Sequence, residues 1–205
     1  MTRQYEDTDT RRAQVAEAAL RTIAEDGVAG FTTKAVAQRV GISEGTLFRH
    51  FVSKEQVVLE AISLLEREME KGLVETGDDL RDLETFFRHR AAFVGAEASV
   101  GRLVFSPELL HLAGPKSSNR IKSWRAKNMD YLATKLSALH TSHKLQSKLG
   151  VGALKLFIQG LLLTFALQPS FETTKAQADL QPRINQAWSS ILLLLDITSP
   201  QHSRS

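Results

Sequence analysis

The stretch from Thr32 to Phe51 permits few folds, because it combines two short helical patterns with a break between them. Gly41 can adopt the left-handed conformation that ends one helix, and Ser43 can cap the next. Apolar residues recur four positions apart on both sides of the break, as expected for one face of a helix: Val36 with Val40, and Leu47 with Phe51. Two short helices joined by a glycine-containing turn are typical of a helix-turn-helix unit.

The second of these short helices is expected to have one packed face and one polar face. Leu47, Phe48 and Phe51 are predicted to be core residues, whereas Arg49 and His50 would face outward. In a helix-turn-helix unit the second helix enters the major groove of DNA, which explains why one side stays polar. Residues 33–54 also carry a local excess of positive charge, with one carboxylate, Glu44, set against Lys34, Arg39, Arg49 and Lys54.

The remainder of the chain indicates an all-α protein. Its 205 residues include 12 glycines and 5 prolines, too few for the frequent turns of an all-β protein. Hydrophobic residues at 42% and charged residues at 24% are ordinary for a soluble globular protein. The apolar spacing predicts helices over residues 10–26, 32–40, 54–75, 80–98 and 120–139, followed by two strongly apolar helices near the C-terminus.

The two C-terminal helices are apolar on most sides, which exceeds what a single core can bury. Left uncovered, such surface would form a large exposed patch, so two chains are expected to pair there. The residues predicted to form this dimer interface are Leu154, Ile158, Leu161, Phe165, Trp188, Ile191 and Leu195.

Several classes of site and location are disfavoured by composition. The chain has no cysteine, which excludes disulfides and thiolate metal sites. The polar, acidic N-terminus does not resemble a signal peptide, and the apolar run 154–167 is short for a membrane span, so a cytoplasmic location is expected. His140 and His143 have helical ligand spacing but no nearby carboxylate, so neither a metal site nor a cofactor is expected.

Residues Arg11 to Ile62 resemble the DNA-binding domain of TetR-family transcriptional regulators. The resemblance rests on the Thr-Thr pair at 32–33, the Ala-x-x-x-Gly-Ile-Ser turn ending at Ser43, the Leu-aromatic-x-His-Phe segment 47–51 and the following Ser-Lys-Glu. It implies an N-terminal three-helix DNA-binding domain, residues 1–55. A larger helical domain for ligand binding and dimerisation, residues 56–205, would follow.

The resemblance also implies roles for individual residues. Thr33 and Lys34 would meet the phosphate backbone, as would His50 and Lys54 on the far side of the recognition helix. The remaining candidates for DNA contact are Ser43, Glu44, Gly45, Thr46 and Arg49. An arginine can bond guanine O6 and N7 as a fork, and a glutamate can accept from cytosine N4. Phe48 departs from the family, which usually has a tyrosine whose hydroxyl contacts DNA.

The family usually places a ligand among its middle helices. Aromatic residues of that region are candidates to line an apolar cavity for a small apolar ligand, although for any single one of them core packing is the favoured interpretation: Phe87, Phe93, Phe105, Trp124 and Tyr131.

The functional hypothesis is a ligand-responsive homodimeric repressor that binds a palindromic DNA operator. One alternative keeps the DNA-binding domain but acts as an activator, or is controlled by a protein partner without a small ligand. An enzyme is disfavoured, because the sequence has no recognisable nucleophile triad, paired carboxylates or phosphate-binding loop.

Overall fold

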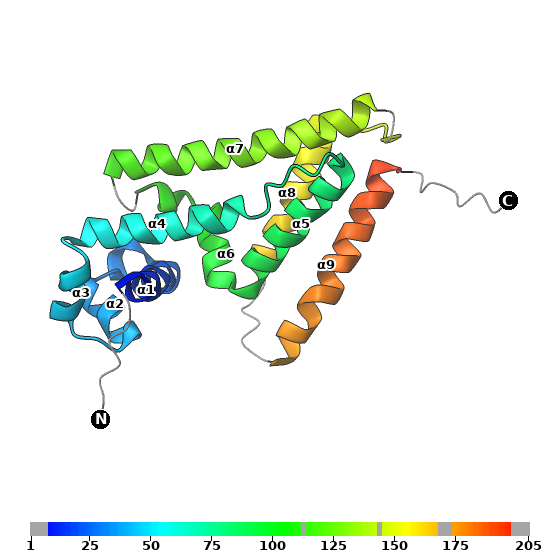
Figure 1. Ribbon diagram of the computed structural model, residues 1–205. Coiled ribbons are helices and arrows are strands. Elements are labelled where there is room, and N and C mark those ends of the chain that lie inside the picture. Colours follow the sequence, from blue (N-terminus) through cyan, green and yellow to red (C-terminus); the bar gives the residue numbers. More distant parts are fainter. Residues whose placement is uncertain (1–7, 112–113, 143–144, 168–173, 198–205) are drawn as a thin grey trace. The chain divides into compact units, whose positions relative to one another are not determined.

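The computed structural model describes residues 8–111, 114–142, 145–167 and 174–197. Every regular element within these ranges is helical, which confirms the all-α prediction (Figure 1). The elements are α1 (Thr8–Gly30), α2 (Thr33–Val40), α3 (Glu44–His50), α4 (Lys54–Glu70), α5 (Asp79–Ala96), α6 (Ala98–Phe105), the short 3-10 helix η1 (Pro107–His111), α7 (Gly114–Thr141), α8 (Val151–Leu167) and α9 (Thr174–Leu195). No helix in the described part of the chain is both long enough and apolar enough to cross a bilayer.

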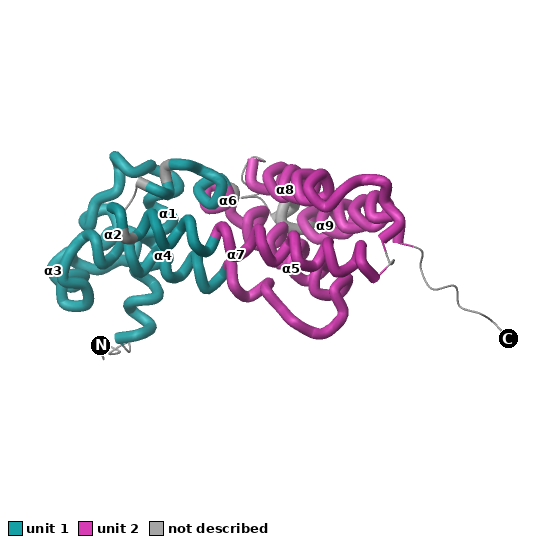
Figure 2. The backbone as a smooth tube through the Cα atoms, turned by 90° about the horizontal axis from the view of Figure 1, so that it is seen from above, with its two compact units in different colours: residues 1–68, 102–124 teal, residues 69–101, 125–205 magenta. Residues whose placement is uncertain are grey.

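The chain divides into two compact units, coloured separately in Figure 2. Unit 1 comprises residues 1–68 and 102–124, and unit 2 comprises residues 69–101 and 125–205. Residues belong to the same unit when their backbones lie close together. The boundary predicted at residue 55 is of another kind, because it separates DNA binding from ligand binding and dimerisation. That functional boundary stays a prediction.

In unit 1, the helix-turn-helix forms as its local residues predicted. The Thr32 hydroxyl accepts a hydrogen bond from the Ala35 N–H at 3.1 Å and so caps α2. Gly41 ends α2 in the left-handed conformation, with φ 76°, a value that is strained for residues with a side chain. Helix α1 lies against α2 and α3, and the shared core includes Val15, Ile23, Val36 and Leu47.

The helix predicted over residues 10–26 is longer in the structure. Gly27 does interrupt it, with φ 70° and ψ 179°, but helical hydrogen bonding resumes and α1 ends at Gly30. Phe31 follows directly and is buried, with 2% of its surface exposed. The burial of this ring gives a physical reason for the extra turn after the glycine.

The prediction that α4 reaches Glu75 is wrong, because the helix ends at Glu70, just after the boundary between the units. The segment that follows instead supports the start of α5. The Thr76 N–H and hydroxyl both donate to Asp82, and Asp78 caps α5 by accepting from the Leu80 N–H at 3.1 Å. Helix α7 also begins earlier than predicted, at Gly114, because Pro115 is tolerated in a first turn.

The core of unit 2 is built around α5, which lies beside α8 and α9 (Figure 1). Phe87 of α5 is fully buried, with its ring 6.0 Å from that of Trp188 and 6.4 Å from that of Phe165. The small residue Gly101 allows close approach, since a Cβ there would lie 3.2 Å from the Ala166 Cα and closer still to the Val94 carbonyl.

Most residues predicted to form the dimer interface belong to this internal core. Leu154, Ile158, Phe165, Trp188, Ile191 and Leu195 are all buried within the single chain, and Leu161 is half-buried. Their regular spacing reflects the face that packs against α5, which corrects the assignment at these positions. The opposite face of α8 carries exposed apolar residues instead, among them Leu156 at 71% and Leu167 at 59% exposure.

Candidate nucleic-acid interface

The recognition helix α3 is held at its start by Ser43 and along one side by the core of unit 1. The Ser43 hydroxyl accepts from the Thr46 N–H at 3.1 Å and lies 2.8 Å from the Thr46 hydroxyl. Leu47 and Phe51, one turn apart, are 0% and 1% exposed. The hydroxyls of Ser43 and Thr46 therefore bond to each other within the protein. Because only the side of α3 with Leu47 packs on the core, the opposite side of the helix stays open to solvent.

Arg12 fixes the end of α3, a role that the sequence reasoning missed. Its Nη1 donates to the His50 carbonyl at 2.8 Å, its Nη2 donates to Glu60 at 2.7 Å, and its guanidinium lies 4.6 Å from the centre of the Phe51 ring. One side chain of α1 thus binds both the last residue of α3 and a residue of α4. The partners lie 38 and 48 positions away, so no local sequence pattern could have identified them.

The prediction that Phe48 is a core residue is wrong, because its side chain is 44% exposed. Neighbouring residues of a helix point about 100° apart, so Phe48 is turned away from the face shared by Leu47 and Phe51. Its ring therefore joins the outward side of α3 together with Arg49.

The polar face of α3 begins with Glu44, which is exposed and accepts a hydrogen bond from the Thr33 hydroxyl at 2.5 Å. This contact links the starts of α2 and α3, both of which contribute predicted DNA-contact residues. Gly45 is exposed, and a Cβ placed there would meet only the Ser43 hydroxyl, at 3.9 Å. The backbone of the first turn of α3 is therefore openly accessible.

Three cations accompany this face. Lys34 and Arg49 are exposed, and neither has a hydrogen-bond or ion-pair partner among the described residues. Lys54 is exposed at the start of α4, with its Nζ 5.1 Å from the centre of the Phe31 ring, while His50 is half-buried. Unpaired surface cations next to an accessible helix face provide the charge that phosphate binding requires.

The start of α4 is a well-formed helix N-terminus. Ser53 accepts from the Gln56 N–H at 3.3 Å, and the Gln56 side chain accepts from the Val52 N–H at 2.7 Å. Hydrogen bonds from the backbone N–H of Glu55 and from Ser53 lower the pKa of the Glu55 carboxyl. Such an N-terminus favours anions, which is consistent with Lys54 holding a phosphate.

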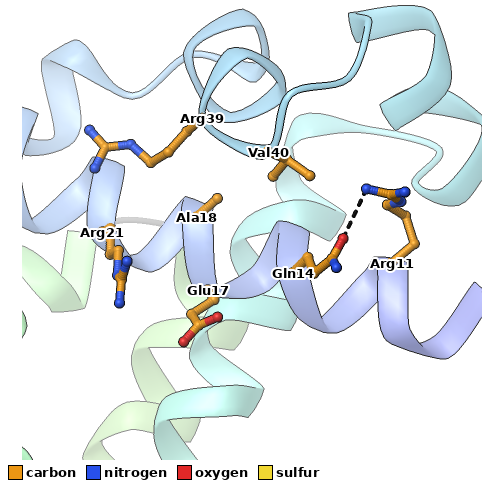
Figure 3. A pocket seen from close by; sticks show the side chains of 7 residues that line it. All are labelled: Arg11, Gln14, Glu17, Ala18, Arg21, Arg39 and Val40. Atoms are coloured by element: carbon orange, nitrogen blue, oxygen red, sulfur yellow. Dashed lines mark hydrogen bonds between the residues drawn. The ribbon is translucent and has the colours of Figure 1, made fainter. Parts of the chain in front are cut away.

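A polar pocket between α1 and α2 presents three further arginines, Arg11, Arg21 and Arg39 (Figure 3). Arg11 donates to Gln14 at 2.9 Å, and Arg39 pairs with Glu25 of α1 at 2.6 Å. With Glu17 also lining the pocket, its positive charge is largely balanced within unit 1. Lys34 and Arg49, by contrast, have no such partner among the described residues.

The five residues predicted to line a ligand pocket are divided between the units. Phe87, Phe93 and Tyr131 belong to unit 2, where Phe93 and Tyr131 pack against the core that contains Phe87. Phe105, 39% exposed, and the buried Trp124 belong to unit 1. Tyr131 borders an open pocket, which is also lined by Glu70, Leu73, Glu75 and Lys127.

His143, one of two histidines considered as metal ligands, lies outside the described residues. Among the residues that are described, no three His, Cys, Asp or Glu side chains gather as a metal site would require.

Comparison with protein families matches residues 15–61 to the family described as bacterial regulatory proteins, tetR family. The HTH-type transcriptional repressor AcnR of Corynebacterium diphtheriae is 37% identical over 75 residues. That match covers 34% of this chain and 40% of the repressor, so it spans less than half the length of this curated relative.

Similarity to solved structures extends over almost the whole chain. AibR, solved in complex with isovaleryl coenzyme A and operator DNA, gives a TM-score of 0.67 at 15% identity, covering 92% of this chain and 100% of that one. The ketosteroid regulator KstR2 of Mycobacterium tuberculosis gives 0.64 at 20% identity, covering 92% and 95%. At these identities the likeness concerns the fold.

Proposed function

The chain belongs to the TetR family of bacterial regulatory proteins, and on this premise we propose that it is a homodimeric, ligand-responsive repressor of transcription that binds a palindromic DNA operator. The observation that carries the proposal is the outward face of α3. Its packed side is buried at Leu47 and Phe51, whereas its open side presents Phe48 and Arg49. Lys34 at the start of α2 and Lys54 at the start of α4 are also exposed. A short rigid helix with such a face fits the major groove of duplex DNA.

The side chains divide into those that read bases and those that position the protein. Arg49 would bond guanine, and Glu44 would accept from cytosine through the oxygen that Thr33 does not use. The exposed Phe48 ring supplies an apolar surface for a thymine methyl group, in place of a hydroxyl contact to phosphate. Lys34, His50 and Lys54 would bind phosphates, a contact that is independent of sequence.

Replacing Arg49 with alanine is expected to weaken operator binding by about 1–3 kcal/mol and to relax base preference at one position per half-site. The operator is first obtained by selection from a random duplex library, and affinity is then measured for every base at each position. Arg39→Ala is the matched control, because Arg39 pairs with Glu25 and is expected to leave base preference unchanged. A library that yields no palindromic sequence would count against the proposed function.

Replacing Lys54 with alanine is expected to weaken all duplexes alike and to reduce the slope of log affinity against log salt by about 1. Lys54→Arg keeps the charge and should keep the slope. If Lys54→Ala changes base preference as Arg49→Ala does, the division into reading and positioning residues is wrong.

Pairing of two chains is proposed to use the exposed face of α8. This face contains Leu156, Phe157 and Leu167 together with the small residues Gly152 and Gly160, and Lys155 is the one charged residue of the helix. A second copy covering this stripe would present two recognition helices to successive major grooves, roughly 34–36 Å apart.

A ligand would act by favouring a state of the protein that does not match this spacing, which requires a coupling of about 1–3 kcal/mol. AibR was solved with an acyl coenzyme A and operator DNA, so acyl coenzyme A thioesters form a reasonable first panel. Release of the operator by a member of the panel would support ligand response. Failure across a broad panel would favour an activator, or a regulator controlled by a protein partner.

A further inference from the structure

Unit 2 contains two buried cations with very different surroundings. Arg90 of α5 is 5% exposed and Lys135 of α7 is 4% exposed. Lys135 has three carboxylate partners, at 2.8 Å from Asp82, 3.3 Å from Asp79 and 2.5 Å from Glu75. Although burial opposes the charged form, these hydrogen bonds raise the pKa of Lys135 above its ordinary value.

Arg90 has no carboxylate partner among the described residues. Its Nη2 donates to the Met69 carbonyl and to the Asn128 side-chain oxygen, and its Nη1 contacts the Met69 sulfur. The guanidinium lies 4.9 Å from the centre of the Phe86 ring. Burial lowers the pKa of Arg90 to about 10, so the group remains charged at neutral pH and its charge is not balanced by an anion.

The hydrogen-bonding capacity of Arg90 is also incompletely used. Its Nε is buried and has no hydrogen-bond partner in the described part of the chain, and the thioether that faces Nη1 is a weak acceptor. Buried polar groups are rarely left unpaired, and a planar guanidinium fork matches a carboxylate or phosphate with two parallel hydrogen bonds. An oxyanion would supply both the missing acceptor and the missing charge.

Two residues that line an open pocket of unit 2 are sequence neighbours of Met69 and Asn128, the hydrogen-bond partners of Arg90. The pocket is lined by Glu70 and Lys127, which directly follow Met69 and directly precede Asn128, and by Leu73, Glu75 and Tyr131. Each of the two carboxylates has an ion-pair partner, Glu70 with Lys127 and Glu75 with Lys135. The Tyr131 ring stacks on Phe86, 5.5 Å away, and Phe86 is the ring beneath the guanidinium. The flexible Met69 side chain can move more readily than a branched residue. Arg90 does not itself line this pocket, so an acidic group would reach its guanidinium by displacing the Met69 side chain, with the Tyr131 ring beside its apolar part.

We propose that unit 2 binds a small organic acid with an apolar body, whose carboxylate or phosphate pairs with the guanidinium of Arg90. This inference deepens the proposed function and rests on it, since the acid would be the effector. It also supplies a link to DNA binding, because the acid would compete with Met69 for Arg90. Met69 lies in the last turn of α4, the helix that begins at Lys54.

The test uses the full chain and measures binding by isothermal titration calorimetry. The probes are hexanoate and hexyl phosphate, which separate the two oxyanions, and hexanamide, which keeps the apolar body without the charge. We expect one or both acids to bind at least about tenfold more tightly than the amide. Arg90→Lys, which keeps the charge but loses the fork, should weaken that binding about tenfold or more.

Arg88→Lys is the matched control, since Arg88 lies on the same helix, pairs with Glu84 at 2.6 Å and should leave acid binding unchanged. Equal binding of acid and amide, or equal acid binding by Arg90→Lys and the unmodified protein, would overturn the inference and indicate a purely structural Arg90. If Arg90→Lys does not fold, the comparison of acid with amide decides. Operator binding is measured separately. A protein that binds DNA but no acid would refute only this inference. A protein that binds acid through Arg90 but no DNA would refute the proposed function.

Discussion

Replacing Lys135 with methionine is expected to lower the free energy of unfolding by about 3–5 kcal/mol. The substitution keeps most of the side-chain volume but removes the ammonium group that lies 2.8 Å from Asp82. Asp82 is 0% exposed, so its carboxylate would remain buried with Thr76 as its other hydrogen-bond partner in the described residues. Chemical denaturation followed by circular dichroism measures the change.

The pH dependence of the free energy of unfolding provides a second test of the pair formed by Asp82 and Lys135. Burial favours a raised pKa for Asp82, but hydrogen bonds from Lys135 and Thr76 outweigh it and lower the pKa below its ordinary value of 3.8. In the unmodified protein the contribution of Asp82 is therefore present above pH 3.8 and is lost as the pH falls through the lower folded value. Without Lys135, burial should raise the pKa of Asp82 instead. The stability difference between the two proteins should then narrow as the pH falls from neutral.

Lys127→Met is the matched control, because Lys127 lies on the same helix, has 59% of its side chain exposed and pairs with one carboxylate, Glu70. Such a surface pair is expected to contribute about 0–1 kcal/mol. The double variant Asp82→Asn with Lys135→Met should recover part of the loss, since no buried charge is left unpaired. Equal losses for Lys127→Met and Lys135→Met would contradict the account.

Replacing Leu156 with glutamate is expected to convert the proposed dimer into a monomer and to weaken operator binding on the order of 100-fold. Leu156 is 71% exposed on the apolar face of α8, so the change should not disturb the core of unit 2. In a dimer the introduced carboxylates would be buried without partners, which is costly. A single DNA-binding domain would then lose the gain in affinity that two linked domains provide.

Sedimentation velocity reports the oligomeric state, and gel shift with the selected operator reports affinity. Leu59→Glu is the matched control, because Leu59 is a partly exposed leucine, at 37%, on α4 and not on α8. A Leu156→Glu protein that remains dimeric would show that pairing does not use this face, without affecting the proposed role of α3.

The helix-turn-helix could be predicted from sequence because each signal is local. Thr32 and Ser43 cap helices by bonding to residues three positions ahead, and Gly41 ends α2 through its own backbone conformation. These interactions involve neighbours in the chain, so their pattern is visible in the letters alone. Where neighbours did not decide, as at the end of α4, the prediction was wrong by five residues.

The apolar spacing of α8 and α9 was detected correctly but interpreted as the wrong surface. Periodicity shows that Leu154 and Ile158 share a face of α8, but it does not show what that face contacts. In the structure α5 covers it, with Phe87 packed between Phe165 and Trp188. A similar limit applies to Phe48, whose exposure depends on which side of a short helix meets the core.

The sequence by itself determines that this protein is all-helical and that it has a capped helix-turn-helix of the TetR type near its N-terminus. Capping, turn conformation and periodicity depend on residues that are only a few positions apart. Tertiary structure alone decided that Arg12 binds the end of α3 and that Lys135 pairs with three carboxylates. It also decided that Arg90 is buried with no carboxylate partner among the residues that the structure describes. These contacts join residues 21 to 60 positions apart, and the energy of a buried charge depends on which distant groups the fold brings beside it.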